Sequence, residues 1–192
     1  IIKEGDHYYI VLTVAQPQPT TAHAGGSVGI DLGVARPVTL STGEYVLPDQ
    51  GLKELDKKAR KAQRKLSRCK RGSIRRLKQK KRVATIRRHQ AARRHARIHQ
   101  ITTEPTRRFS VIAVEDLKVS NMTKRAKEKN VAAKSGLNRE ILNVAPHAFR
   151  AQLEYKALRT GSEVFAVPPH YTSQTCSECG CTNKESRKSQ AR

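Results

Sequence analysis

Two acidic residues, each at the end of a short apolar run, are the strongest candidates for chemistry in this sequence. Asp31 follows residues 28–30, and Glu115 follows residues 111–114. Carboxylates that adjacent strands bring together can hold the divalent ions that phosphodiester hydrolysis needs. We therefore predict that Asp31 and Glu115 are catalytic and bind Mg²⁺ or Mn²⁺.

The residues around each acid refine this prediction. A lone aspartate in a strand is usually a turn-capping or ion-paired residue, but Gly29 and Gly33 on either side of Asp31 leave room for a metal and a phosphate. Alternation along the second run places residues 111, 113 and 115 on one face, which favours Glu115 over Asp116. Asp116 could equally cap a loop or helix.

The overall charge indicates which polyanion would be bound. The 192 residues include 39 Lys and Arg and 16 Asp and Glu, a net charge of +23, which points to nucleic acid. A membrane surface would also attract such a chain, but no apolar stretch approaches the length of a span and no start resembles a signal peptide. We expect no membrane partner and a cytoplasmic location. Because the first residue is Ile1, we expect a piece of a longer polypeptide.

Most of this charge falls in one segment with helical periodicity. Apolar residues recur at steps of three and four from Leu52 to Cys69, and after Gly72 they recur at steps of seven, at Leu77, Ala84, Ala91 and Ile98. The pattern predicts an antiparallel helical hairpin over residues 52–104 that turns at Gly72. Residues 52–100 hold 21 Lys and Arg but only two acids, Glu54 and Asp56.

A charge run is usually a solvated helix face, but such a face normally carries both signs. Like charges four residues apart destabilise a helix unless something screens them. We therefore predict phosphate binding, which would be steeply salt-dependent and carry little sequence information. The residues expected to bind nucleic acid are Lys57, Lys61, Arg64, Lys65, Arg68, Arg75, Arg76 and Lys80.

The remaining pattern predicts a small mixed α/β domain. Aromatic residues are few and apolar residues make up 36 % of the chain, which suits one modest aliphatic core. We expect Asp31 mid-way along its strand, a polar and mobile stretch over 118–135, and a helix over 137–160 that kinks or restarts at Pro146. Strands are expected at residues 7–14, 27–34, 37–40, 44–47, 111–114 and 163–167, with 27–47 forming an antiparallel meander.

The cysteines indicate a metal rather than a disulfide framework. Cys176 and Cys179 have the spacing of half a zinc ribbon, but a closed structural site needs four ligands. Cys181, His170 or a second pair beyond Arg192 could supply the others. Cys69 lies on the apolar stripe of the first predicted helix, where a small core residue is the simplest interpretation. We predict no structural disulfide.

Five segments together resemble the OrfB/TnpB transposon-encoded proteins, relatives of the type V CRISPR effectors. They are Val28-Gly-Ile-Asp-Leu-Gly-Val34, Lys61-Ala-Gln-Arg-Lys-Leu-Ser-Arg68, Val114-Glu-Asp-Leu117, Gln152-Leu-Glu-Tyr-Lys-Ala157 and Tyr171-Thr-Ser-Gln-Thr-Cys-Ser-Glu-Cys-Gly180. The resemblance covers almost the whole chain from Gly26 onward.

The resemblance implies a RuvC-like nuclease of RNase H-like fold that uses a guide RNA and cuts DNA beside a short transposon-associated motif. It also implies a prokaryotic, nucleoid-associated protein. Asp31 matches the first catalytic aspartate, Glu115 the catalytic glutamate, and Cys176 with Cys179 the first zinc knuckle. The implied domains are the tail of a guide- and target-binding region (1–25), the nuclease domain with its hairpin insertion (26–168) and half of a zinc ribbon (169–192).

The family pattern continues where this sequence stops. A second zinc knuckle and a further catalytic aspartate follow in the family, whereas this chain ends at Arg192. Because loss of one acid impairs a two-metal site, we expect this chain to bind nucleic acid and to cleave it poorly or not at all. The alternatives are a non-catalytic nucleic-acid-binding module on a degenerate nuclease scaffold, and an actin-like ATPase, whose second phosphate loop has no glycine-rich candidate here.

Overall fold

Five strands form one mixed sheet in the computed structural model, which describes residues 1–4, 7–15, 24–126 and 130–169. Their order across the sheet is β5-β4-β3-β6-β7. β4 is antiparallel to both β3 and β5, while β6 is parallel to both β3 and β7. The strands are β3 Gly26–Asp31, β4 Val38–Leu40, β5 Tyr45–Val46, β6 Phe109–Glu115 and β7 Glu163–Val167.

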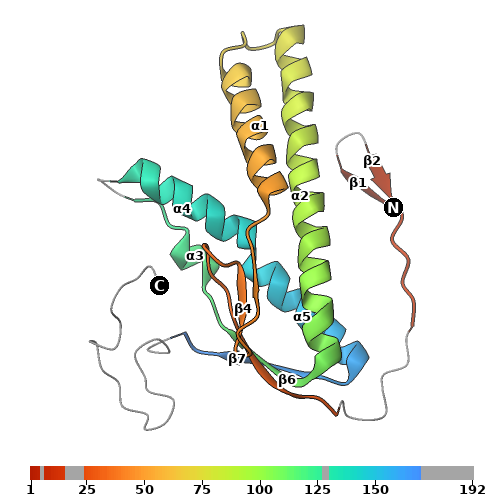
Figure 1. Cartoon of the computed structure of the whole chain (residues 1–192). Helices are drawn as coiled ribbons and strands as arrows, with labels where there is room; N and C mark the ends of the chain where they lie inside the picture. Colours follow the sequence, from red (N-terminus) through yellow and green to blue (C-terminus); the bar gives the residue numbers. More distant parts are fainter. Residues whose placement is uncertain (5–6, 16–23, 127–129, 170–192) are drawn as a thin grey trace.

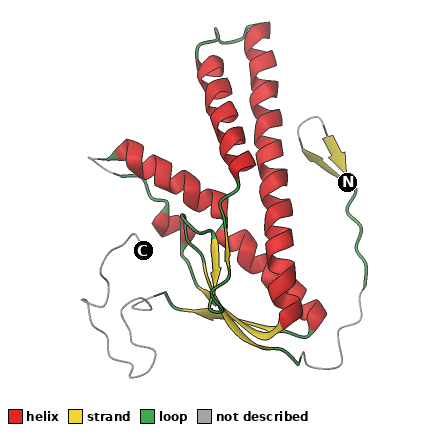
Figure 2. Ribbon diagram, viewed as in Figure 1, coloured by secondary structure: helices red, strands yellow, loops and turns green. Residues whose placement is uncertain are grey.

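Helices occur in both connections between parallel strands, and α2 and α5 pack on the same face of the sheet (Figures 1 and 2). The first contains α1 Gln50–Ser67 and α2 Ile74–Arg108. The second contains α3 Val119–Met122, α4 Val131–Val144 and α5 Pro146–Thr160. The core lies between the sheet and helices α2 and α5, and it contains Val28, Ile30, Val38, Leu40, Ile98, Ile112, Val114, Phe149 and Leu153.

The face of the sheet opposite α2 and α5 is here called the open face. Core residues such as Ile30 and Val114 point towards the helices, so their neighbours Asp31 and Glu115 point the other way. In β7, Phe165 is 50 % exposed on the open face. The acids therefore lie on the face that the packed helices leave accessible.

Helices α1 and α2 lie side by side and are joined by a turn in which Gly72 adopts a φ of +76°. The Asp49 carboxylate caps the first turn of α1, and the Ser73 hydroxyl caps α2 by accepting from the Arg76 amide. The predicted apolar face of α1 is confirmed, since Leu52, Ala59 and Ala62 are buried there.

The seven-residue apolar series predicted for α2 is wrong. Leu77 is 57 % exposed, and Ala84 and Ala91 are also exposed, so among the four predicted positions Ile98 alone is buried. Arg76 and Gln90 make the hydrogen bonds to α1 instead. Polar side chains thus line much of this seam, which an apolar pattern cannot reveal; the less exposed positions are 76, 79, 83, 86 and 90.

Several predicted boundaries also differ from the structure. Asp31 is the last residue of β3, not a mid-strand residue. The stretch 118–135, predicted as mobile, contains α3 and the start of α4. The restart predicted at Pro146 is confirmed, since Pro146 occupies the first turn of α5 after Ala145 at a φ of +51°. The strand predicted over 163–167 is confirmed.

The predicted strand 7–14 is present only at its beginning. β2 His7–Tyr9 pairs antiparallel with β1 Ile2–Glu4, and residues 10–15 form no strand. Ile10 is 76 % exposed and Leu12 80 %. A strand-forming composition needs a partner strand to become a strand, and residues 10–15 pair with none of the described residues.

One buried lysine joins α5 to α2. The Lys156 Nζ donates to the His99 carbonyl at 2.5 Å and to the Thr102 and Thr103 hydroxyls at 2.7 and 2.8 Å. The residue is 6 % exposed. Burial, with a smaller contribution from Arg107, lowers the pKa of Lys156 below its ordinary 10.5.

Stability should therefore rise with pH as the lysine loses its proton. Between the lowered pKa of the folded state and about 10.5, the unfolded chain binds more protons than the folded chain, so the free energy of unfolding increases with pH. Denaturant unfolding from pH 7 to 10.5 should show this slope, and Lys156→Met should remove its contribution. Lys58→Met, at an exposed position of α1, is the control that keeps the slope. An unchanged slope in Lys156→Met would contradict the assignment.

Candidate active site and nucleic-acid interface

The structure brings the two predicted catalytic acids together at the carboxyl ends of two interior strands of the sheet. Asp31 ends β3 and Glu115 ends β6, two neighbouring parallel strands. The register pairs Ile30 with Val114, so Asp31 and Glu115 are the next position on each strand. Neighbouring strands are about 4.8 Å apart, and residues at matching positions point to the same face. Residues 84 positions apart thus place two carboxylates side by side on the open face.

Small residues lie beside the acids on this face. Gly29 and Ala113 precede them by two positions and are paired in the register. The Gly29 amide donates to the Ser41 hydroxyl at 3.0 Å, which holds the turn after β4 against β3. A larger side chain at either position would lie directly beside a carboxylate on the open face, so the small residues leave more room around Asp31 and Glu115.

The neighbouring acid Asp116 has a different role. Its Oδ1 accepts from the Arg150 Nη1 of α5 at 2.7 Å, while its amide donates to the Val167 carbonyl. Arg150 also pairs with Glu154 at 2.7 Å, and these two carboxylates raise its pKa, Glu154 more strongly. Asp116 therefore joins β6 to α5, and the role of Glu115 as a metal ligand stays a prediction.

The two carboxylates suit a hard divalent ion. Mg²⁺ and Mn²⁺ take oxygen ligands, and Mg²⁺ in phosphate-cleaving sites is commonly held by one or two carboxylates together with substrate oxygens. Among the described residues there is no cluster of three or more His, Cys, Asp or Glu able to enclose a metal. The predicted zinc ligands Cys176 and Cys179, with the alternatives His170 and Cys181, lie outside the described residues. Asp31 and Glu115 fit the open carboxylate type of site.

Residues 50–100, which comprise α1, the turn and most of α2, are here called the basic hairpin. The predicted nucleic-acid-binding residues lie mainly on its outer surface. Lys57, Lys61, Arg64, Lys65 and Arg68 are exposed and fall on the side of α1 opposite its buried residues, and we call them the α1 stripe. Arg75 and Lys80 of α2 are also exposed. Their binding role stays a prediction, and their exposure is what it requires.

Arg76 is the exception among the predicted binding residues. Its Nη1 donates to the Leu66 carbonyl at 3.0 Å and to the Cys69 carbonyl at 3.3 Å. These carbonyls belong to the last turn of α1 and the residues just after it, where helix carbonyls lack intrahelical partners. Arg76 therefore joins the two helices near their turn, a structural role that its residue type did not reveal.

The two acids of the basic hairpin reduce the positive charge of its surface only slightly, because one of them is buried. Asp56 is 6 % exposed and accepts from the Gln90 side chain of α2 and, at 2.8 Å, from the Asn143 Nδ2 of α4. Glu54 is the single exposed acid between residues 52 and 100. The outer surface of the hairpin is thus almost purely cationic, while Asp56 fastens α1 to α2 and α4.

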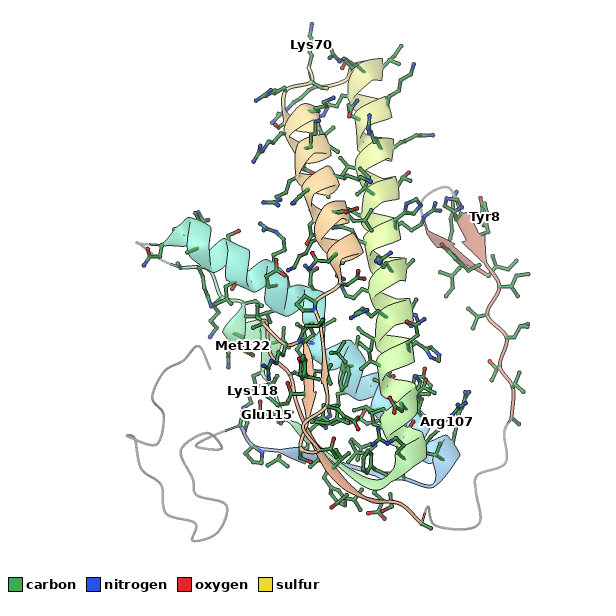
Figure 3. The ribbon with its side chains drawn as sticks, viewed as in Figure 1. Tyr8, Lys70, Arg107, Glu115, Lys118 and Met122 are labelled. Carbon is green, nitrogen blue, oxygen red and sulfur yellow. The ribbon has the colours of Figure 1, made fainter. Side chains whose placement is uncertain are left out.

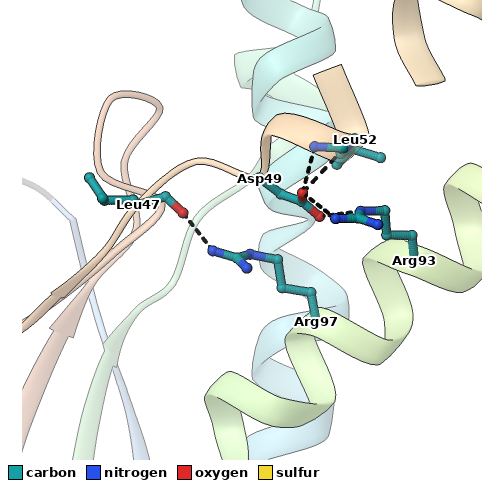
Figure 4. A network of polar contacts seen from close by, with 6 residues as sticks. Leu47, Asp49, Leu52, Arg93 and Arg97 are labelled. Carbon is teal, nitrogen blue, oxygen red and sulfur yellow. Dashed lines mark hydrogen bonds and ion pairs between the residues drawn. The ribbon is translucent and has the colours of Figure 1, made fainter. Parts of the chain in front are cut away.

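A second polar network fixes the base of the hairpin (Figure 4). Arg93 of α2 binds both carboxylate oxygens of Asp49 at 2.6 and 2.8 Å, and Asp49 accepts from the Gly51 and Leu52 amides. Arg97 donates to the Leu47 carbonyl at 2.6 Å. The Arg93 guanidinium is the main cause that lowers the pKa of Asp49. The segment that follows β5 is therefore held rigidly against α2.

The basic hairpin projects away from the sheet edge that carries the acids. Figure 3 shows Lys70 at the tip of the hairpin and Glu115 at the sheet, with Lys118 beside it. At 1.5 Å per residue, the 18 residues of α1 span about 27 Å, which equals roughly 8 base pairs of a duplex. A nucleic acid that contacts both regions must therefore be a polymer of some length. No described helix is long and apolar enough to cross a membrane.

The sequence matches two family models. Residues 9–126 match OrfB_IS605, described as a probable transposase, and residues 147–191 match the Cas12f1-like TNB domain. The first match covers more than half of the chain and includes both acids and the basic hairpin.

Two curated relatives carry the name "Putative RNA-guided DNA endonuclease". InsQ of Escherichia coli (strain K12) is 41 % identical over a 192-residue alignment that covers 96 % of this chain and 48 % of the relative. The protein of Streptomyces pristinaespiralis is 33 % identical over 165 residues, covering 85 % of this chain and 38 % of the relative. The chain thus spans less than half the length of either relative.

Solved structures share the fold at low sequence identity. A Cas12f1–sgRNA–target DNA complex and a CRISPR-Cas12f ternary complex, both determined by cryo-EM, match with TM-scores of 0.53 and 0.55. Each is 21 % identical, and each match covers 85 % of this chain and about a third of the other. With the family match over residues 9–126, the shared mixed sheet and the placement of the acids, the chain belongs to the OrfB/TnpB family of probable transposases.

Proposed function

We propose that this protein is the nuclease part of an RNA-guided DNA endonuclease with a RuvC-like, RNase H-like fold. The observation that carries the proposal is the side-by-side placement of Asp31 and Glu115 at the ends of parallel strands, on the open face of the sheet. The names of the two curated relatives and the nucleic acids in the Cas12f complexes support it. The substrate would be DNA, selected by a guide RNA.

The chain's own residues would act by binding and positioning. Asp31 and Glu115 would hold Mg²⁺ or Mn²⁺, which supplies an activated water and positive charge at the scissile phosphate. The α1 stripe would bind phosphates of the nucleic acid, and the room left by Gly29 and Ala113 would admit the strand to be cut. Water would attack in line, with no covalent bond between protein and DNA.

A structural zinc site is the second part of the proposal. Cys176 and Cys179 have the spacing of one zinc knuckle, and the match to the Cas12f1-like TNB domain over residues 147–191 includes them. Thiolates bind Zn²⁺ far better than Mg²⁺, so the two metal sites would not compete for ions.

Guide-dependent DNA cleavage is the test of this function. A polypeptide with the full length of the curated relatives that contains these residues should cleave DNA complementary to its guide RNA when Mg²⁺ or Mn²⁺ is present. Removal of either guide or metal should stop the reaction. Binding without cleavage under all these conditions would instead support the non-catalytic nucleic-acid-binding module.

A further inference from the structure

An exposed tyrosine lies in the same row of the sheet as the two acids. The register places Tyr45 opposite Thr39, and Thr39 opposite Asp31. Residues directly opposite each other point to the same face, so Tyr45, Thr39, Asp31 and Glu115 form one line across the open face. With strands about 4.8 Å apart, Tyr45 is roughly 10 Å from Asp31 along this line. Adjacent nucleotides of one strand can span this distance.

An arginine stacks on this tyrosine. The Arg36 guanidinium carbon lies 4.4 Å from the centre of the Tyr45 ring, and Tyr45 remains 50 % exposed. Arg36 is exposed in the loop between β3 and β4, and no acidic side chain of the described residues pairs with it. The pair thus offers an aromatic surface and an uncompensated cation at the surface.

The short loop between β3 and β4 places Arg36 close to Asp31. Asp31 and Arg36 are separated by four residues, one of which is Gly33. A Cβ atom on Gly33 would lie 3.0 Å from the Arg36 carbonyl oxygen, so the loop folds closely on itself and a larger residue would shift the Arg36 backbone by a few tenths of an ångström. The short loop therefore keeps Arg36 close to Asp31, while strand pairing places Tyr45.

This position separates the pair from the other cation–π pairs of the described residues. Lys3 stacks on Tyr8 near the N-terminus, Arg108 on Phe109 is bound to Glu44 and Glu104, and Arg159 stacks on Tyr155 in α5. Among the aromatic residues of these pairs, only Tyr45 shares a row with the acids. Aromatic rings next to arginines are the usual platforms for bases of single-stranded nucleic acids.

We propose that Tyr45 and Arg36 form a binding site for one nucleobase of the single-stranded DNA whose phosphate lies at Asp31 and Glu115. The Tyr45 ring stacks on the base, and Arg36 contacts the ring and a neighbouring phosphate. The identity of the strand as DNA rests on the proposed nuclease function, whereas the stacking site itself does not. Tyr45 is then a positioning residue that sets which phosphate reaches the acids.

Binding of fluorescent single-stranded DNA to the 192-residue chain tests this site. The probes are oligonucleotides in which 2-aminopurine, a base that loses fluorescence on stacking, replaces one base at successive positions. Wild type should quench the probe at one position, and Tyr45→Ala should abolish that quenching and bind about tenfold more weakly. Tyr45→Phe should retain both. Tyr155→Ala, which breaks the matched Arg159–Tyr155 pair in α5, should behave as wild type.

Three results would overturn the proposal: equal quenching by wild type and Tyr45→Ala, an equal loss in Tyr155→Ala, or a Tyr45 dependence seen with RNA oligonucleotides and not with DNA. Circular dichroism verifies folding, and if Tyr45→Ala is unfolded, Tyr45→Leu, which keeps an apolar side chain of similar length without the ring, replaces it with the same expectations. The outcome is separable from the proposed function. Stacking at Tyr45 without Asp31-dependent cleavage would contradict the proposed nuclease function and support the base-binding site. Asp31-dependent cleavage without stacking at Tyr45 would contradict the base-binding site alone.

Discussion

Asp31→Asn and Glu115→Gln should each reduce metal-dependent DNA cleavage by at least roughly 1,000-fold, because metal ions supply several kcal/mol of transition-state stabilisation that a lost ligand forfeits. Each substitution removes one charge and keeps the side-chain shape, so the sheet edge should remain folded. The assay is guide-dependent cleavage of labelled DNA by the full-length polypeptide described above, with Mg²⁺ and with Mn²⁺.

Asp116→Asn is the matched control for this prediction. It removes the same charge from the residue next to Glu115, but Asp116 is bound to Arg150 of α5. The pair is partly exposed, and such pairs contribute up to about 1 kcal/mol, so cleavage should stay within a fewfold of wild type. Loss of cleavage in Asp116→Asn together with normal cleavage in Glu115→Gln would show that the wrong acid has been assigned.

Reversing three charges of the α1 stripe should weaken nucleic-acid binding by at least roughly 100-fold near 0.1 M salt. The variant combines Lys57→Glu, Lys61→Glu and Arg64→Glu. These side chains are exposed and lie opposite the buried face of α1. The three new acids repel one another as the cations did, but each lies four residues from a remaining cation, Lys53, Lys65 or Arg68, so the helix should not be destabilised.

Salt dependence identifies how the α1 stripe binds. If the three residues contact phosphates, the slope of log affinity against log salt should become shallower by about 3. The control variant combines Lys3→Glu, Arg107→Glu and Arg159→Glu, which changes net charge equally at exposed positions outside the basic hairpin. Equal losses in both variants would mean that net charge, and not the hairpin surface, drives binding.

The candidate acids could be predicted from the sequence because each short apolar strand has few acidic residues at its end. Residues 111–114 are apolar on both faces, so the first charged residue after them marks the end of the buried strand, and alternation assigns Glu115 to the face of Ala113. The structure adds what local pattern cannot give, the parallel pairing of β3 with β6, which brings in Asp31 across 84 residues.

Polar contacts over long sequence distances explain what the sequence did not reveal. Asp56 reads as a surface acid in a basic helix, yet it is buried because Gln90 and Asn143 satisfy it from two other helices. Arg76 reads as a phosphate-binding residue, yet α1 presents carbonyls to it. The seven-residue series in α2 failed for the same reason, since Gln90 rather than Ala91 contacts α1. Such partners depend on the fold and leave no periodic signal.

Manganese binding tests the joint metal site most directly. Free Mn²⁺ gives an electron paramagnetic resonance signal that is lost on binding, so titration of the 192-residue chain measures affinity without cleavage. Asp31→Asn and Glu115→Gln should each weaken the same site at least roughly tenfold, and the double variant should bind no more weakly than either single variant. A site that neither substitution affects, or two losses that simply add, would show that the two carboxylates do not hold a metal together.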